Sequence, residues 1–152
     1  MNLTEKIAHQ TLARWQRTLR LNDWDITIKI MDHSWRKSGD IKIDLEDRKA
    51  VLLLNEKPKC QNLDELVIHE LMHLKLWEMD QMIEELIDAV YGKKDTAQRD
   101  FAYTQFMKTL ETTVEDLTKG LLAAAKCKSP LSFGRLSCAI EAETSARRRP
   151  AG

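Results

Sequence analysis

The sequence has little of what marks several specialised protein classes. Its 152 residues include only three cysteines, Cys60, Cys127 and Cys138, and no C-x-x-C pair. An odd number of cysteines without that spacing argues against a disulfide framework and against a cysteine-based zinc site. No apolar run approaches the roughly 20 residues that a transmembrane helix needs. The first residues, MNLTEKIAHQ, lack the apolar segment of a signal peptide, so we expect a cytoplasmic protein without a membrane partner.

The chain also lacks an excess of charge of either sign. It has 24 basic and 24 acidic residues, and its formal net charge is zero. Proteins that bind nucleic acid or an anionic membrane through charge usually carry an excess of Lys and Arg, so neither partner is expected here. Charged residues make up 32% and hydrophobic residues 43% of the chain, as in ordinary globular proteins. The length suits one domain with a hydrophobic core, and nothing in the sequence predicts an oligomeric state.

Hydrophobic periodicity predicts an α+β fold. Alternating or continuous apolar residues predict three strands, over residues 24–30, 39–45 and 50–55. Helical periodicity predicts four helices, over residues 3–20, 63–77, 81–90 and 96–125. Because the connections between the strands are short, we expect a mainly antiparallel meander that packs on an N-terminal helix, a buried central helix and a long C-terminal helix.

The composition changes near Cys127. Residues 127–152 are rich in Ser and Ala and end in Arg147-Arg148-Arg149-Pro150-Ala151-Gly152. They hold five basic and two acidic residues, a net charge of +3, which leaves −3 for residues 1–126. We therefore expect residues 1–126 to form the folded domain and residues 127–152 to be a disordered basic tail. The arginines alone are weak evidence for a nucleic-acid-binding arm.

The segment from His69 to His73 reads H-E-x-x-H within the predicted helix over residues 63–77. Residues four apart share a face of a helix, so His69 and His73 can direct two imidazoles to one point. Glu70 lies about 100° further round the helix, near enough to reach a water held at that point. Two histidine ligands and a carboxylate base form the arrangement of zinc proteases. The sequence therefore predicts Zn²⁺ bound by His69 and His73, with Glu70 as the catalytic base.

The surroundings of the motif favour this prediction. Asn62 is a good N-cap residue for the helix, and Glu65 follows three residues later. The helix is apolar around most of its circumference, which is typical of a buried helix. Burying two histidines and a glutamate is costly unless something satisfies them, and a metal ion would do so. The alternative is a pair of core histidines bonded to backbone carbonyls, with Glu70 at the surface.

A catalytic zinc site needs a third protein ligand. No histidine follows the motif, and His9 and His33, which precede it, are expected to be ordinary surface or packing residues. An acidic ligand from a later helix is therefore expected. The candidates are Glu84, Glu85, Glu111 and Glu115.

Helical geometry ranks Glu111 first among these candidates. The helix over residues 96–125 carries a core-facing apolar stripe, formed by Tyr103, Phe106, Met107, Leu110, Val114, Leu117 and Leu121. Glu111 lies at the edge of this stripe, whereas Glu115 lies further towards solvent. We expect Glu111 to be the third ligand and Glu115 to orient one of the ligand histidines. The alternative is that both are solvated acids on the helix surface.

The HELMH motif, followed by a later helix with Glu111-Thr-Thr-Val-Glu115, resembles the gluzincin class of zinc metallopeptidases. The short length and the layout of strands and helices are similar to minigluzincins and to small phage- or prophage-type HExxH proteins, over residues 22–122. This resemblance implies a small zincin-like fold in which His69, His73 and Glu111 bind zinc and Glu70 is the general base. It also implies an endopeptidase, sometimes latent, that cleaves an extended peptide or protein substrate, with Tyr103 a candidate electrophile.

Two other functions fit the same ligand set. The first is a non-catalytic, zinc-stabilised module that binds or regulates a partner protein. The second is a DNA-linked protease resembling the SprT type, against which stand the neutral charge and the absence of a cysteine-rich zinc module.

Overall fold

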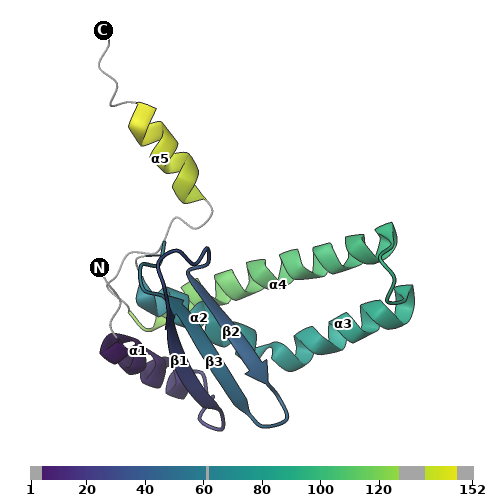
Figure 1. Cartoon of the computed structure of the whole chain (residues 1–152), viewed down its shortest axis with the longest axis horizontal. Coiled ribbons are helices and arrows are strands. Elements are labelled where there is room, and N and C mark those ends of the chain that lie inside the picture. The colour runs from purple at the N-terminus through teal and green to yellow at the C-terminus, as the bar shows by residue number, and fades with distance from the viewer. Residues whose placement is uncertain (1–4, 61, 127–135, 147–152) are drawn as a thin grey trace.

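A computed structural model describes residues 5–60, 62–126 and 136–146. Within these residues the fold is α+β, as predicted, with five helices and one three-stranded sheet (Figure 1). The elements in chain order are α1 (Glu5–Thr18), β1 (Asp25–Met31), β2 (Gly39–Asp44), β3 (Lys49–Asn55), α2 (Leu63–Lys75), α3 (Trp77–Tyr91), α4 (Ala97–Ala124) and α5 (Ser137–Ala146). None of the helices in the described ranges combines the length and apolarity needed to cross a bilayer.

The sheet is mixed, so the prediction of a mainly antiparallel meander is wrong for one of the two strand pairs. The strand order is β1-β3-β2. β1 pairs in parallel with β3, with Asp25 opposite Lys49, whereas β2 pairs antiparallel with β3, with Gly39 opposite Leu54. β3 occupies the centre because it is the most apolar strand: Ala50, Leu52 and Leu54 are buried on one face, and the residues between them are half-buried. The alternating strands, which have a polar face, take the edges.

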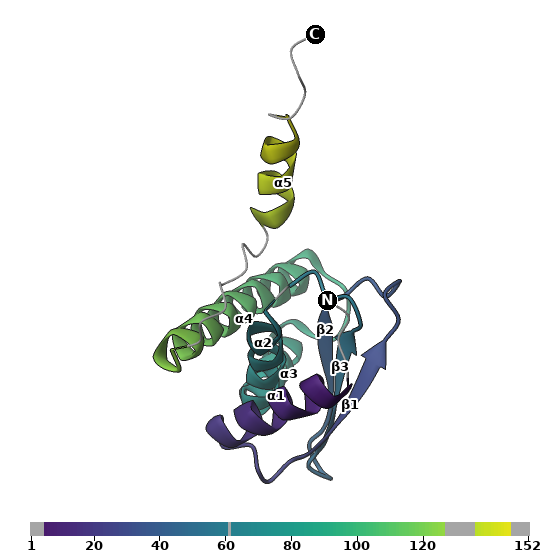
Figure 2. The same cartoon turned by 90° about the vertical axis from the view of Figure 1, so that its left-hand side faces the viewer.

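Helices α1 to α4 lie on one side of the sheet, as Figure 2 shows. α2 is the central element, because it contacts α1, α3, α4 and β2. Its side chains Val67, Ile68 and Leu71 are fully buried, as expected for a helix that is apolar nearly all round. α2 also packs against α4, in which Leu110 and Val114 are buried.

The helix starts follow their capping residues. The Asn62 side chain accepts a hydrogen bond from the Glu65 N–H, and the Thr96 side chain accepts one from the Arg99 N–H, so the predicted N-cap at Asn62 is confirmed. The predicted end of α2 at residue 77 and the predicted start of α3 at residue 81 are corrected. α2 ends at Lys75 and α3 begins at Trp77, because the sequence between them contains no Gly or Pro and the chain only changes direction at Leu76.

Within residues 127–152, which the sequence predicts to be a disordered tail, Ser137–Ala146 form the helix α5. Ala and Glu are strong helix formers and make up half of this segment, although it lacks an apolar stripe. Leu136 and Ile140 are exposed, and α5 stands apart from the other elements in both views (Figures 1 and 2). Residues 127–135 and 147–152 lie outside the described residues.

Because α5 stands apart from the domain, we predict that it contributes little to the stability of residues 1–126. Deleting residues 127–152 should leave the melting temperature of the domain unchanged, as measured by thermal unfolding followed by circular dichroism. A truncated chain that fails to fold, or that melts well below the full chain, would show that the tail belongs to the folded unit.

Candidate metal centre

His69 and His73 lie on the side of α2 that faces α4. They are one helical turn apart, and their Nε2 atoms approach to 3.3 Å. Their ring centroids are 5.0 Å apart and their planes are inclined by 68°. The two side chains are 22% and 18% exposed, so the imidazoles are largely buried but can still be reached. The convergence predicted from the four-residue spacing is therefore present.

Glu111 of α4 completes a group of three. Its Oε2 lies 3.7 Å from His69 Nε2, and its Oε1 lies 3.5 Å from His73 Nε2. One potential ligand atom from each of the three residues lies within 4.8 Å of the other two. The neighbouring residues Leu110 and Val114 are buried against the core, so packing of the apolar stripe turns Glu111 towards α2.

Glu115, one turn further along α4, contacts the other side of the His69 ring. Its Oε2 lies 3.2 Å from His69 Nδ1, and its Oε1 lies 2.8 Å from Lys119 Nζ. Burial alone would raise the pKa of Glu115, but the Lys119 hydrogen bond and charge, together with His69, lower it. An ionised Glu115 accepts the Nδ1–H of His69, which leaves the Nε2 lone pair of that ring directed at Glu111 and His73.

Glu70 is buried, with 7% of its surface exposed, which rules out the alternative that placed it at the surface. Burial, followed by the charges of Asp40 and Glu111, raises the pKa of Glu70 to about 8. For His73, burial is the main cause of a lowered pKa, although Glu111 acts in the opposite direction. Near neutral pH the imidazole of His73 is therefore uncharged, the form in which histidine binds a metal ion.

Sequence reasoning missed the contact between β2 and Glu70. A Cβ atom placed on Gly39 would lie 2.7 Å from Glu70 Oε1 and 2.9 Å from Leu66 Cδ1. Only a residue without a side chain allows the edge strand to approach the carboxylate so closely. No local pattern reports such a contact between a strand and a helix. The Lys119–Glu115 pair was also missed, although its i, i+4 spacing on one helix could have revealed it.

The remaining candidates lie outside this cluster. Glu84 and Glu85 are on α3, where Glu84 is half-buried and Glu85 is exposed, and neither joins the three potential ligands. His9 is exposed on α1. His33 is exposed in the turn after β1, where its Nδ1 lies 3.0 Å from Glu56 Oε1.

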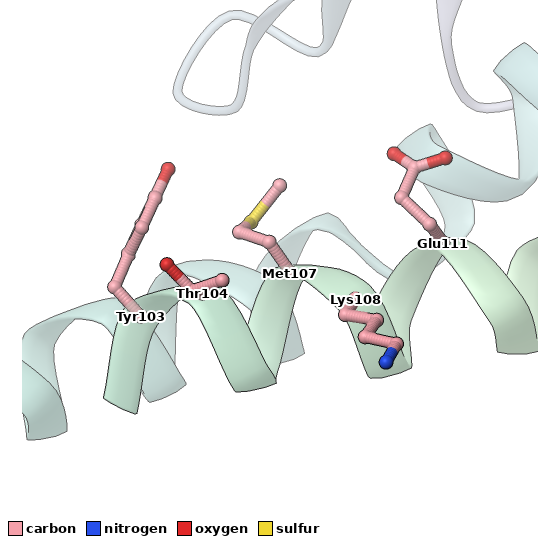
Figure 3. Close-up of a pocket in the computed structure, with 5 residues that line it drawn as sticks. All are labelled: Tyr103, Thr104, Met107, Lys108 and Glu111. Atoms are coloured by element: carbon pink, nitrogen blue, oxygen red, sulfur yellow. The ribbon is translucent and has the colours of Figure 1, made fainter. Parts of the chain in front are cut away.

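Beside Glu111 an open cavity of about 320 Å³ runs along α4. It is lined by Tyr103, Thr104, Met107, Lys108 and Glu111. Figure 3 shows Tyr103, Met107 and Glu111 projecting from the same side of the helix, with the Lys108 amine directed away from them. Tyr103 precedes Glu111 by two turns, roughly 12 Å along the helix axis. The candidate electrophile is thus well removed from the cluster of histidines and glutamate.

Comparisons of the chain with protein-family models, with curated proteins and with solved structures find no match. The assignment of a chemistry to this cluster therefore rests on its own residues and distances.

The burial of Glu70 predicts a pH dependence of stability for the chain without metal. A carboxyl whose pKa is higher in the folded state stabilises the fold at low pH and loses that contribution as the pH rises. His73, with a lowered pKa, has the opposite effect, but only below its unperturbed value of 6.5. Between pH 6.5 and the Glu70 pKa of about 8, the free energy of unfolding should therefore fall.

The measurement is urea unfolding in the presence of a chelator at several pH values, with Glu70→Gln as the control. The substitution removes the titrating carboxyl, so it should flatten the decline in this pH range. A decline of equal steepness in Glu70→Gln would assign the pH dependence to other groups.

Proposed function

We propose that this chain is a zinc-dependent peptidase of the gluzincin type with a small zincin-like domain. The observation that carries the proposal is the close approach of the potential ligands: the two Nε2 atoms are 3.3 Å apart, and the Glu111 carboxylate lies 3.5 Å from His73 Nε2 through Oε1 and 3.7 Å from His69 Nε2 through Oε2. Zinc bonds of 2.0–2.1 Å in a tetrahedron place neighbouring ligands about 3.3 Å apart. Two imidazoles and one carboxylate, with the fourth position open, are also the donors of many catalytic zinc sites.

The residues around the site fit distinct roles in hydrolysis. When bound, zinc lowers the pKa of a water to about 7 and polarises the scissile carbonyl. Glu70 accepts a proton from the attacking water and passes it to the leaving amine. Its raised pKa refers to the chain without metal, and a nearby divalent cation would lower it. Glu115 holds His69 in the orientation and tautomer that metal binding requires.

The strand order supports an extended substrate at β2. β1 and β2 are the two edge strands of the sheet, but only β2 has Glu70 directly against its backbone, at Gly39. An extended peptide that adds to the free edge of β2 by main-chain hydrogen bonds would therefore pass beside the base. The substrate in this proposal is an unstructured or locally unfolded segment of a protein.

A second candidate is a zinc-stabilised binding module without turnover. It is favoured by the fact that the potential ligands come from two elements, His69 and His73 from α2 and Glu111 from α4. A bound ion would link the two helices and stabilise the fold whether or not catalysis follows. Both candidates predict zinc binding, and only the peptidase predicts hydrolysis that depends on Glu70.

We predict that alanine substitutions of the four candidate glutamates weaken zinc binding to different degrees. Glu111→Ala removes a ligand and should weaken zinc binding most severely, whereas Glu115→Ala should weaken it roughly tenfold to a hundredfold. Glu84→Ala and Glu85→Ala, which change acids outside the cluster, are the matched controls and should have little effect. Calorimetric titration of the four variants with zinc measures this order. If Glu84→Ala or Glu85→Ala weakened zinc binding more than Glu111→Ala, the third ligand would lie on α3.

We predict that Glu70→Gln separates metal binding from catalysis. The substitution keeps the shape of the side chain but removes the proton acceptor. Zinc should remain bound, while cleavage of an unstructured protein such as denatured casein should fall at least about a hundredfold. Metal analysis and a gel-based cleavage assay give the two readouts. Full zinc loading in the wild type without any cleavage would favour the binding module instead.

A further inference from the structure

α3 packs on the rest of the protein with a side that mixes polar and apolar residues. The side chains that face α4 include the buried residues Asp80 and Ile87 and Asp88, which accepts hydrogen bonds from the Arg99 guanidinium at 2.7 and 3.0 Å. Ile87 is the only apolar residue of this helix that is buried. Among the described residues, α3 contacts only α2 and α4 to an appreciable extent. α3 thus leaves a large part of its apolar surface exposed, unlike an ordinary surface helix, which buries its apolar face.

The apolar residues of α3 form a stripe that faces solvent. Met79, Met82, Leu86 and Val90 are 47%, 59%, 56% and 63% exposed. Their spacing of three, four and four residues places them on one face of the helix over about three turns. We call this set the α3 stripe. Contiguous exposed apolar surface of this kind marks interaction sites in soluble proteins, and methionine suits it because its flexible side chain adapts to different partners.

Charge identifies the kind of partner. α3 carries five acidic residues and no basic residue. Two of the acids, Glu78 and Glu85, are exposed and lie roughly 90° round the helix from the centre of the α3 stripe. They form an acidic border along one side of it. A partner segment with Lys or Arg beside its own apolar face would complement both the stripe and the border.

The same border disfavours two other occupants. In an antiparallel pair of α3 helices related by a two-fold axis, Glu85 of one copy would lie beside Glu85 of the other, because both are near the middle of the helix. An anionic membrane surface would repel the acidic border. The observations therefore favour a basic segment from another protein over a second copy or a lipid surface.

We propose that the α3 stripe is a docking site for a basic amphipathic helix of a partner protein. This interaction is separate from the proposed peptidase chemistry, because the stripe contains no residue of the histidine and glutamate cluster. It would hold a substrate protein or a regulator by a segment distant from the bond that is cleaved. Binding should weaken as salt screens the attraction between the basic helix and the acidic border.

The probe is a labelled 18-residue helical peptide of leucine and lysine, with leucine at every third or fourth position. Its counterpart carries glutamate in place of each lysine. Fluorescence anisotropy with the full-length chain should show binding of the lysine peptide and at least about tenfold weaker binding of the glutamate peptide. Equal binding of both peptides, or binding of neither, would overturn the proposal.

Variants locate the peptide on the protein. Met82→Gln combined with Leu86→Gln should weaken binding of the lysine peptide about tenfold or more, because it removes apolar contact area. Phe101→Gln is the matched control: Phe101 is 67% exposed but lies on α4, so its loss should leave binding unchanged. Glu78→Lys combined with Glu85→Lys should reverse the preference between the two peptides.

Two results would contradict the docking site. Equal losses from Phe101→Gln and from the stripe variant would show that the peptide binds exposed apolar surface without selection. A wild-type dimer in light scattering that becomes monomeric in the stripe variant would assign the α3 stripe to a second copy of the chain.

Discussion

The constraint on which the rest of the structure depends is the burial of ionisable side chains on α2. His69, Glu70 and His73 share a helix with Val67, Ile68 and Leu71, which are fully buried. Polar groups in such surroundings need partners. α4 supplies Glu111 and Glu115 to the histidines, and β2 passes close to Glu70 at Gly39. The positions of α4 and β2 relative to α2 are therefore requirements of the site as well as of the core.

The candidate site could be predicted from the sequence because its rules are local. Helical spacing alone brings His69 and His73 together, and the apolar stripe of α4 selects the face on which Glu111 lies, which the structure places 3.5 and 3.7 Å from the two imidazoles. The catalytic and zinc-binding roles of these residues stay predictions. Their geometry could be predicted because the regular rotation of a helix fixes the direction of each side chain from its position in the sequence.

What the sequence left open depended on contacts between distant segments. Alternation marks β1 and β2 as half-buried strands, but it does not say that β3 lies between them. That order follows from the comparison of whole strands, since the most apolar one gains most from the centre of the sheet. The approach of Gly39 to Glu70 likewise depends on how β2 packs against α2, which neither segment's sequence shows by itself. α5 contains strong helix formers but lacks the apolar stripe that marks a helix in a sequence.

α4 divides the protein into parts of unequal stability. Its second half is fixed by the buried residues Leu110, Val114, Thr118 and Leu122, and Glu111 and Glu115 belong to this half. Its first half, before Leu110, has no buried residue and pairs with α3 (Figure 1), through contacts that include the Asp88–Arg99 ion pair. Regions with few buried apolar contacts open at lower free energy than the core. The α3–α4 arm can therefore adapt to a partner while the cluster of histidines and glutamate, which the core holds, keeps its geometry.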